Sequence, residues 1–105
     1  MRNVIIESPY AGDVKENLKY ARECVRDSLM RGESPIASHL LYTQEGILND
    51  EIKEERTFGI NAGLSWLEVA DVHVFYIDKG MSEGMKIAMD RSMTMGKSIE
   101  QRRIR

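Results

Sequence analysis

The chain has 105 residues, of which 42% are hydrophobic and 30% are charged, a composition typical of one globular domain spanning residues 1–105. Lys and Arg number 15 and Asp and Glu number 17, so the net charge of −2 excludes the strong basic excess of a dedicated nucleic-acid-binding protein. Apolar runs are far shorter than the roughly 20 residues of a membrane-spanning helix. Cys24 is the single cysteine, which excludes an internal disulfide. We therefore expect a cytoplasmic protein (host cytoplasm if the gene is viral) with no membrane or nucleic-acid partner.

The first third of the chain predicts a strand followed by a helix. Residues 3–7 form a short apolar run rich in β-branched side chains, which is typical of a buried strand. Pro9 and Gly12 interrupt this run. Asp13 can cap a helix over residues 13–31, where apolar side chains recur at steps of three and four residues. Cys24 falls within this helix and is interpreted as a packing residue.

The middle of the chain predicts a second strand at residues 35–38 and a loop at 43–50. A second helix should span residues 50–68, with Asn49 or Asp50 as its cap. Gly59 and Gly63 lie four residues apart and share one face of that helix. This face either packs closely against the sheet or another subunit, or leaves room for a ligand.

The last third predicts a strand at residues 72–77, a helix at 82–95 that Ser82 can cap, and a short strand at 97–101. Alternating strands and helices favour right-handed crossovers, which give a small, mainly parallel sheet with helices on both faces. His73 alternates with core residues of its strand and is interpreted as structural.

Ligands of such sheets bind beyond the carboxyl ends of the strands, where three segments of this chain should converge. The helix start at Ser82 carries free N–H groups and a dipole that favour an anion. We expect a ligand between Pro9–Gly12 and Ser82–Met85, with His39 or Tyr42 at the rim. The predicted binding residues are Ser8, Pro9, Tyr10, Gly12, His39, Tyr42, Asp78, Ser82, Gly84 and Met85.

The His, Cys and remaining charged residues show no spacing typical of a metal or cofactor site. No His and Cys cluster has the spacing of a zinc site, and no dinucleotide or P-loop motif is present, so no metal or cofactor is expected. Glu51, Glu54 and Glu55 are interpreted as an exposed acidic helix start. The cationic residues 102–105 are interpreted either as a solvated tail or as a contact to an acidic patch on a neighbouring subunit or to a phosphate.

Four segments resemble a known superfamily in their sequence and order. They are residues 5–13 (IIESPYAGD), 38–44 (SHLLYTQ), 66–72 (WLEVADV) and 82–85 (SEGM). With these segments the chain resembles the nucleoside 2-deoxyribosyltransferase-like superfamily over nearly its whole length. Its small members from bacteria and their phages are the most similar.

This resemblance implies a flavodoxin-like α/β sandwich that binds a nucleoside or nucleotide and forms homo-oligomers. It implies that the loop with Pro9 and Tyr10 lies against the sugar or phosphate, and that the turn with Ser82 holds the sugar or its 5′-phosphate. The position of the family's nucleophilic Glu is Ala88 here, and the position of its supporting Asp is Gly63. Neither residue can form a covalent glycosyl intermediate.

Three interpretations of function remain open. The first is a nucleoside- or nucleotide-binding protein that lacks the covalent chemistry and sequesters a nucleotide or an ADP-ribose-like signal. The second is an N-glycosidic hydrolase or transferase that acts through a relocated carboxylate, Asp78 or Glu83. The third is a structural or interaction subunit with a vestigial pocket.

Overall fold

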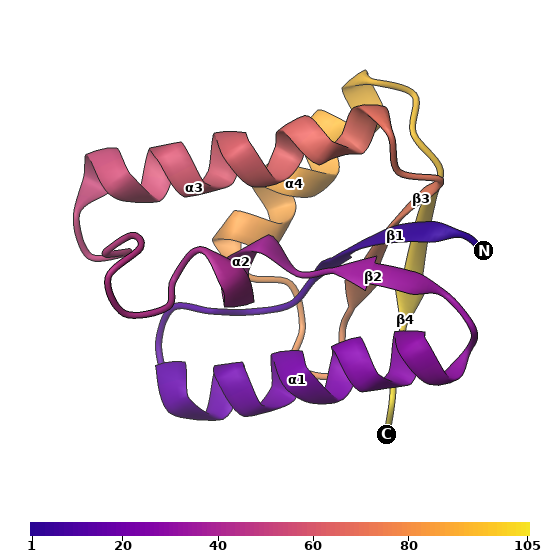
Figure 1. Cartoon of the computed structure of the whole chain (residues 1–105), viewed down its shortest axis with the longest axis horizontal. Coiled ribbons are helices and arrows are strands. Elements are labelled where there is room, and N and C mark those ends of the chain that lie inside the picture. Colours follow the sequence, from indigo (N-terminus) through magenta and orange to yellow (C-terminus); the bar gives the residue numbers. More distant parts are fainter.

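The computed structural model describes all 105 residues. Its sheet has four parallel strands in the spatial order β2-β1-β3-β4 (Figure 1). The strands are β1 (Asn3–Glu7), β2 (Ser34–Ile36), β3 (Val72–Tyr76) and β4 (Ile99–Arg102). Ile5 of β1 lies between Ile36 of β2 and His73 of β3. The predicted parallel sheet is confirmed.

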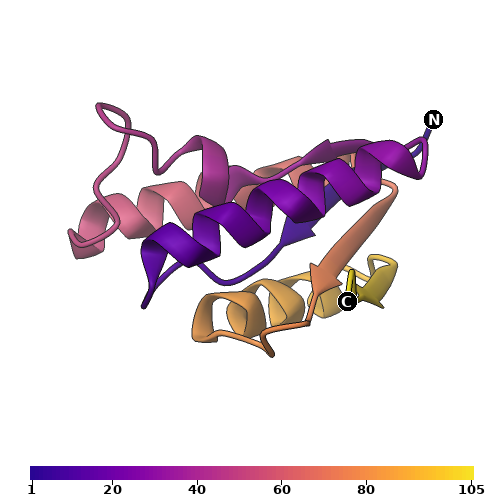
Figure 2. The ribbon, with the colours of Figure 1, turned by 90° about the horizontal axis from the view of Figure 1, so that it is seen from below.

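Helices cover both faces of the sheet. They are α1 (Val14–Met30), α2 (Ser38–Leu41), α3 (Lys53–Ser65) and α4 (Glu83–Thr94), with a 3-10 turn, η1 (Trp66–Glu68), after α3. In Figure 1 α1 lies below the sheet and α3 and α4 lie above it, and Figure 2 shows α1 in front of the strands. Because helices lie on both faces of the sheet, the predicted α/β sandwich is confirmed.

None of the helices has the length and apolar character that crossing a bilayer requires.

Strand β1 is buried on both faces, which explains its continuous apolar run. Val4 and Ile6 pack with Cys24 beneath α1. Ile5, which points to the opposite face, packs with Leu64 of α3. Burial raises the pKa of the Cys24 thiol to about 12, so this group stays a thiol at neutral pH and serves packing, as expected.

Two predicted boundaries were wrong in detail. The helix expected at residues 50–68 begins at Lys53, and its N-cap residue, Ile52, makes no side-chain cap. Instead of capping the helix, the Asn49 side-chain oxygen accepts a hydrogen bond from the Glu51 N–H within the preceding loop. The second strand ends at Ile36 because α2 begins two residues later.

The interpretation of the cationic residues 102–105 as a solvated tail was wrong for Arg102. Arg102 is buried and forms a bidentate ion pair with Glu33, with both N–O distances at 2.7 Å. Arg105 pairs with Glu23 of α1 at 2.8 Å. The backbone N–H groups of Ile104 and Arg105 both donate to the Asp78 carboxylate. The acidic partners of the tail therefore belong to the same chain.

The face with two glycines packs against α2 and the loop that follows it rather than against the sheet. A Cβ on Gly63 would lie 2.8 Å from the Ser38 Cβ, closer than real side chains approach. A Cβ on Gly59 would lie 3.3 Å from a methyl group of Leu48. Gly63 therefore permits the close packing of α3 against α2, whereas Gly59 also borders the cavity described next.

Candidate functional site

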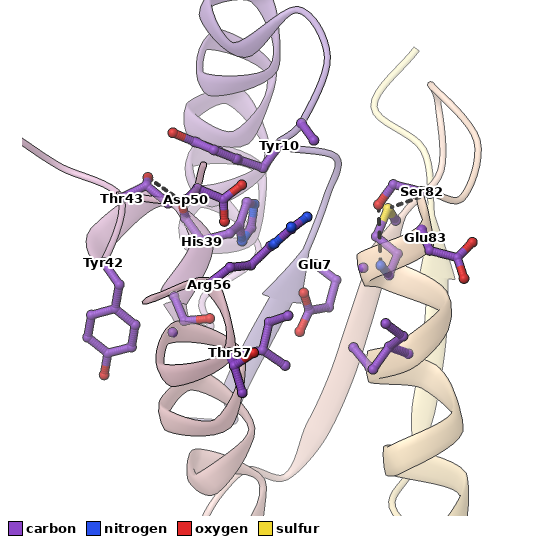
Figure 3. Close-up of a pocket in the computed structure, with 18 of the residues that line it drawn as sticks. Glu7, Tyr10, His39, Tyr42, Thr43, Asp50, Arg56, Thr57, Ser82 and Glu83 are labelled. Carbon is purple, nitrogen blue, oxygen red and sulfur yellow. Dashed lines mark hydrogen bonds between the residues drawn. The ribbon is translucent and has the colours of Figure 1, made fainter. Parts of the chain in front are cut away.

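A cavity of about 380 Å³ opens beyond the carboxyl ends of the strands, within the size range of small-molecule sites. Strand β1 contributes Glu7 and the following loop contributes Ser8 and Tyr10. Helices α2 and α3 form one wall and the start of α4 forms the opposite wall (Figure 3). The connectivity of a parallel sheet thus brings distant segments of the chain to one place.

Most of the predicted site residues lie around this cavity. Those that line it are Ser8, Tyr10, His39, Tyr42, Ser82, Glu83, Gly84 and Met85. Pro9, Gly12 and Asp78 are not among the lining residues. The three predicted segments therefore converge, although individual residues within them point elsewhere.

Asp78 does not border the cavity, because its carboxylate is bound to the tail and to α1. It accepts hydrogen bonds from the Tyr20 hydroxyl at 2.6 Å and from the Ile104 N–H at 3.0 Å. Desolvation alone would raise the pKa of Asp78, but these hydrogen bonds outweigh it and lower the pKa below its ordinary value. Asp78 therefore anchors the C-terminus, and we withdraw it as a binding or catalytic candidate.

The start of α4 presents unpaired backbone donors to the cavity. The Ser82 hydroxyl accepts from the Met85 N–H at 3.2 Å and thereby caps the helix, as predicted. The N–H groups of Glu83 and Gly84 belong to the first turn and have no partner within the protein. A Cβ on Gly84 would meet nothing within 4 Å, so the space in front of this turn is open. An anion or a hydroxyl group can therefore reach these donors.

Arg56 faces these donors from the other wall. Its guanidinium forms no ion pair or hydrogen bond and reaches toward α4 across the cavity (Figure 3). Four carboxylates nevertheless outnumber the two cations among the lining residues, which are Glu7, Asp50, Glu55, Glu83, Lys53 and Arg56. The cavity therefore favours a ligand with one anionic group near Arg56 over a ligand with several phosphates.

His39 and Ser8 form a polar pair at the base of the loop after β1. The His39 Nε2 lies 2.6 Å from the Ser8 Oγ, and the His39 Nδ1 is buried without a partner. Burial lowers the pKa of His39 more than the nearby Glu7 carboxylate raises it, so the imidazole is neutral at pH 7. His39 therefore brings no positive charge to the cavity, and its Nε2 is engaged by Ser8.

Tyr10 and Tyr42 were both predicted as binding residues, and the structure directs their rings differently. Tyr10 lies over Asp50 on the side of the wall that α2 and α3 form, whereas the ring of Tyr42 points away from Glu7 and Ser82 (Figure 3). The Tyr42 hydroxyl accepts a long hydrogen bond of 3.3 Å from the indole N–H of Trp66. Tyr10 is therefore the better placed of the two to stack on a base.

Sequence reasoning missed Glu7 and the first turns of α3. Glu7 ends a buried strand at the ligand edge of the sheet, and a charged residue at that position is a signal that could have been used. Lys53 and Arg56 carried no such signal, because an alternating charge pattern is typical of any solvated helix. Glu55, interpreted as part of an exposed helix start, also lines the cavity and accepts a hydrogen bond from the Asn49 N–H.

The structure is a small α/β domain with a cavity at the carboxyl edge of its sheet. The chain belongs to the family described as a domain of unknown function, DUF7768, whose model matches residues 2–102. No curated protein sequence matches the chain.

One solved structure with the same fold is a 2-deoxyribosyltransferase from the psychrotolerant bacterium Bacillus psychrosaccharolyticus, described as a biocatalyst for the synthesis of nucleosides. The identity is 19% and the TM-score is 0.63, over 96% of this chain and 72% of that enzyme. The resemblance to the deoxyribosyltransferase-like superfamily is thereby confirmed at the level of the fold.

The two positions that the resemblance assigns to carboxylates lie in different surroundings. Ala88 lines the cavity on α4 and its side chain is almost fully buried. Gly63 packs against Ser38 and does not line the cavity. The wall formed by α4 therefore carries a methyl group where the resemblance places a nucleophile.

Proposed function

We propose that the protein binds a nucleoside or nucleoside monophosphate in this cavity. One observation carries the proposal: the free N–H groups at the start of α4 and the free guanidinium of Arg56 lie on opposite walls of the same cavity. This arrangement suits a sugar hydroxyl or a single phosphate. Tyr10 suits a base, because aromatic stacking contributes about 1–3 kcal/mol per base. The shared fold with a nucleoside-processing enzyme supports the same ligand class.

The proposed activity does not include transfer of a sugar between bases. A double displacement requires a nucleophile that forms a glycosyl intermediate, and Ala88 supplies none. Of the two relocated carboxylates considered from the sequence, Asp78 is engaged by the tail and Glu83 is exposed on the first turn of α4. A binding site without covalent transfer chemistry is therefore the interpretation that we favour.

Titration calorimetry with a panel of 2′-deoxynucleosides, their 5′-monophosphates, ADP-ribose and ATP tests this proposal. We expect the nucleosides and monophosphates to bind and ATP to bind most weakly, because the lining carboxylates repel additional phosphates. Arg56→Gln should weaken monophosphate binding about tenfold. Arg91→Gln is the matched control, since Arg91 is exposed on α4 and lies outside the cavity. Absence of heat with every member of the panel would contradict the proposal.

We also propose that the protein forms a homo-oligomer. The two surfaces first considered for this contact, the face with two glycines and the cationic tail, make contacts within the chain. Exposed apolar side chains on and after α3 offer another surface, with Phe58 66% and Trp66 44% exposed. Light scattering should therefore report a mass of at least two chains at micromolar concentration, and Phe58→Glu should shift it toward one chain. A wild-type mass of one chain would contradict the proposal.

A further inference from the structure

Glu7 is a carboxylate at the base of the cavity, at the end of β1. Its side chain is only 13% exposed, although Glu is rarely buried without a specific partner. Its single hydrogen bond joins Oε2 to the His73 Nε2 at 2.8 Å. The other oxygen, Oε1, forms no hydrogen bond and is not closed off from the cavity. Figure 3 shows the carboxylate in the space between α3 and α4.

His73 holds this carboxylate from within the sheet. Its side chain is fully buried on β3, and its ring packs on Phe75 with a centroid distance of 4.4 Å. A carboxylate oxygen only accepts hydrogen bonds, so the His73 Nε2 is the donor. The buried Nδ1 has no partner, so Glu7 is the only polar contact of the His73 ring. The contact fixes one oxygen of Glu7 and leaves the other for a ligand.

The remaining carboxylates around the cavity are less suited to chemistry. Glu83 is exposed, and Glu55 is engaged by the Asn49 N–H at 3.0 Å. Asp50 comes from the loop before α3 and is about half-buried. Glu7, in contrast, belongs to the central part of the sheet and is held by a buried residue, which is the rigid placement that acid–base chemistry requires.

We propose that Glu7 is the catalytic carboxylate of an N-glycosidic hydrolase activity, an inference that rests on nucleoside binding in this cavity. Glu7 accepts a proton from a water molecule while the water oxygen forms a bond to the anomeric carbon of the sugar. The bond from that carbon to the base breaks, and its electron pair goes to the base nitrogen. That nitrogen takes up a proton from solvent, and Glu7 releases the proton it accepted back to solvent. The products are the free base and the free sugar. His73 is a positioning residue.

In this mechanism a proton acceptor on β1 takes the place of the nucleophile that the resemblance assigns to α4. Ala88 leaves the α4 wall without a carboxylate, and Glu7 brings one to the same cavity from the sheet. A direct attack by water needs no covalent intermediate. Hydrolysis without exchange of bases is therefore the expected outcome.

The test incubates the wild-type protein, Glu7→Gln and the control Asp90→Asn with 2′-deoxynucleosides and their 5′-monophosphates. Asp90 is exposed on α4 and lies outside the cavity. Free base is quantified by chromatography and binding by calorimetry. We expect the wild type to release base, Glu7→Gln to lose at least 100-fold in rate with affinity changed less than fivefold, and Asp90→Asn to stay within threefold of wild type. A Glu7→Gln variant as fast as wild type would overturn the inference.

Two further results separate this inference from the proposed function. Wild-type protein that binds a nucleoside but releases no base overturns the hydrolase activity and leaves the binding function intact. Absence of binding overturns both. If circular dichroism shows that Glu7→Gln does not fold, Glu7→Asp keeps the charge but withdraws it by one methylene. That variant should lose at least tenfold in rate, and an unchanged rate would overturn the inference.

Discussion

The ion pair between Glu33 and Arg102 should dominate the acid stability of this protein. Both side chains are almost buried, with exposures of 10% and 6%, and Arg2 and the Ser28 hydroxyl complete the hydrogen bonds to Glu33. The bidentate hydrogen bonds from Arg102 outweigh desolvation and lower the pKa of Glu33 from 4.5 to about 2. This difference corresponds to about 3 kcal/mol of stability at neutral pH.

The direction of the pH dependence follows from the lowered pKa. Because the unfolded chain takes up a proton at Glu33 before the folded protein does, the contribution is present above pH 4.5. It is lost as the pH falls from 4.5 toward 2. The variant Glu33→Gln should therefore unfold with about 3 kcal/mol less free energy than wild type at pH 7, and the difference should shrink to about 1 kcal/mol at pH 2.5.

Urea denaturation followed by far-ultraviolet circular dichroism measures this difference at both pH values. Glu100→Gln is the matched control, because Glu100 also pairs with Arg102 but its side chain is 40% exposed. That variant should lose less than about 1 kcal/mol at pH 7. A Glu33→Gln variant that loses no more than the control, or that loses the same amount at pH 7 and pH 2.5, would refute the reasoning.

Four other substitutions test the packing and the site. Gly63→Ala should lower the free energy of unfolding by about 1–3 kcal/mol in urea denaturation, because the added methyl collides with Ser38, and full stability would contradict this packing. Ser82→Ala should cost about 1 kcal/mol of stability through the lost cap and weaken nucleoside binding in calorimetry. If Ser82→Ala and Gly84→Val both bind nucleosides as tightly as wild type, the site lies elsewhere. Ala88→Glu should fold with reduced stability and gain base exchange detectable by chromatography. Base exchange by the wild-type protein would contradict the view that Ala88 stands in place of the required nucleophile.

The sequence alone was sufficient to predict the four strands, the helices α1, α3 and α4, and the edge of the sheet where the cavity lies, but not the short helix α2. Strands such as residues 3–7 are readable because burial on both faces leaves a continuous apolar run. The helices α1 and α4 are readable because Asp13 and Ser82 cap them in the structure as expected. The start of α3 was placed wrongly because its N-cap, Ile52, makes no side-chain cap that a sequence pattern would reveal.

Only the tertiary structure decided which side chains meet. Glu7 and His73 are 66 positions apart, and Glu33 and Arg102 are 69 apart. Local hydrogen bonding and burial set strand and helix patterns within a few residues, so a short window of sequence contains them. Contacts between distant side chains depend on strand order and register, which bring Glu7 to the cavity and assign Asp78 to the tail. The sequence by itself thus determined most of the elements and the edge of the sheet that holds the cavity, while strand order and packing decided which residues of that edge line it.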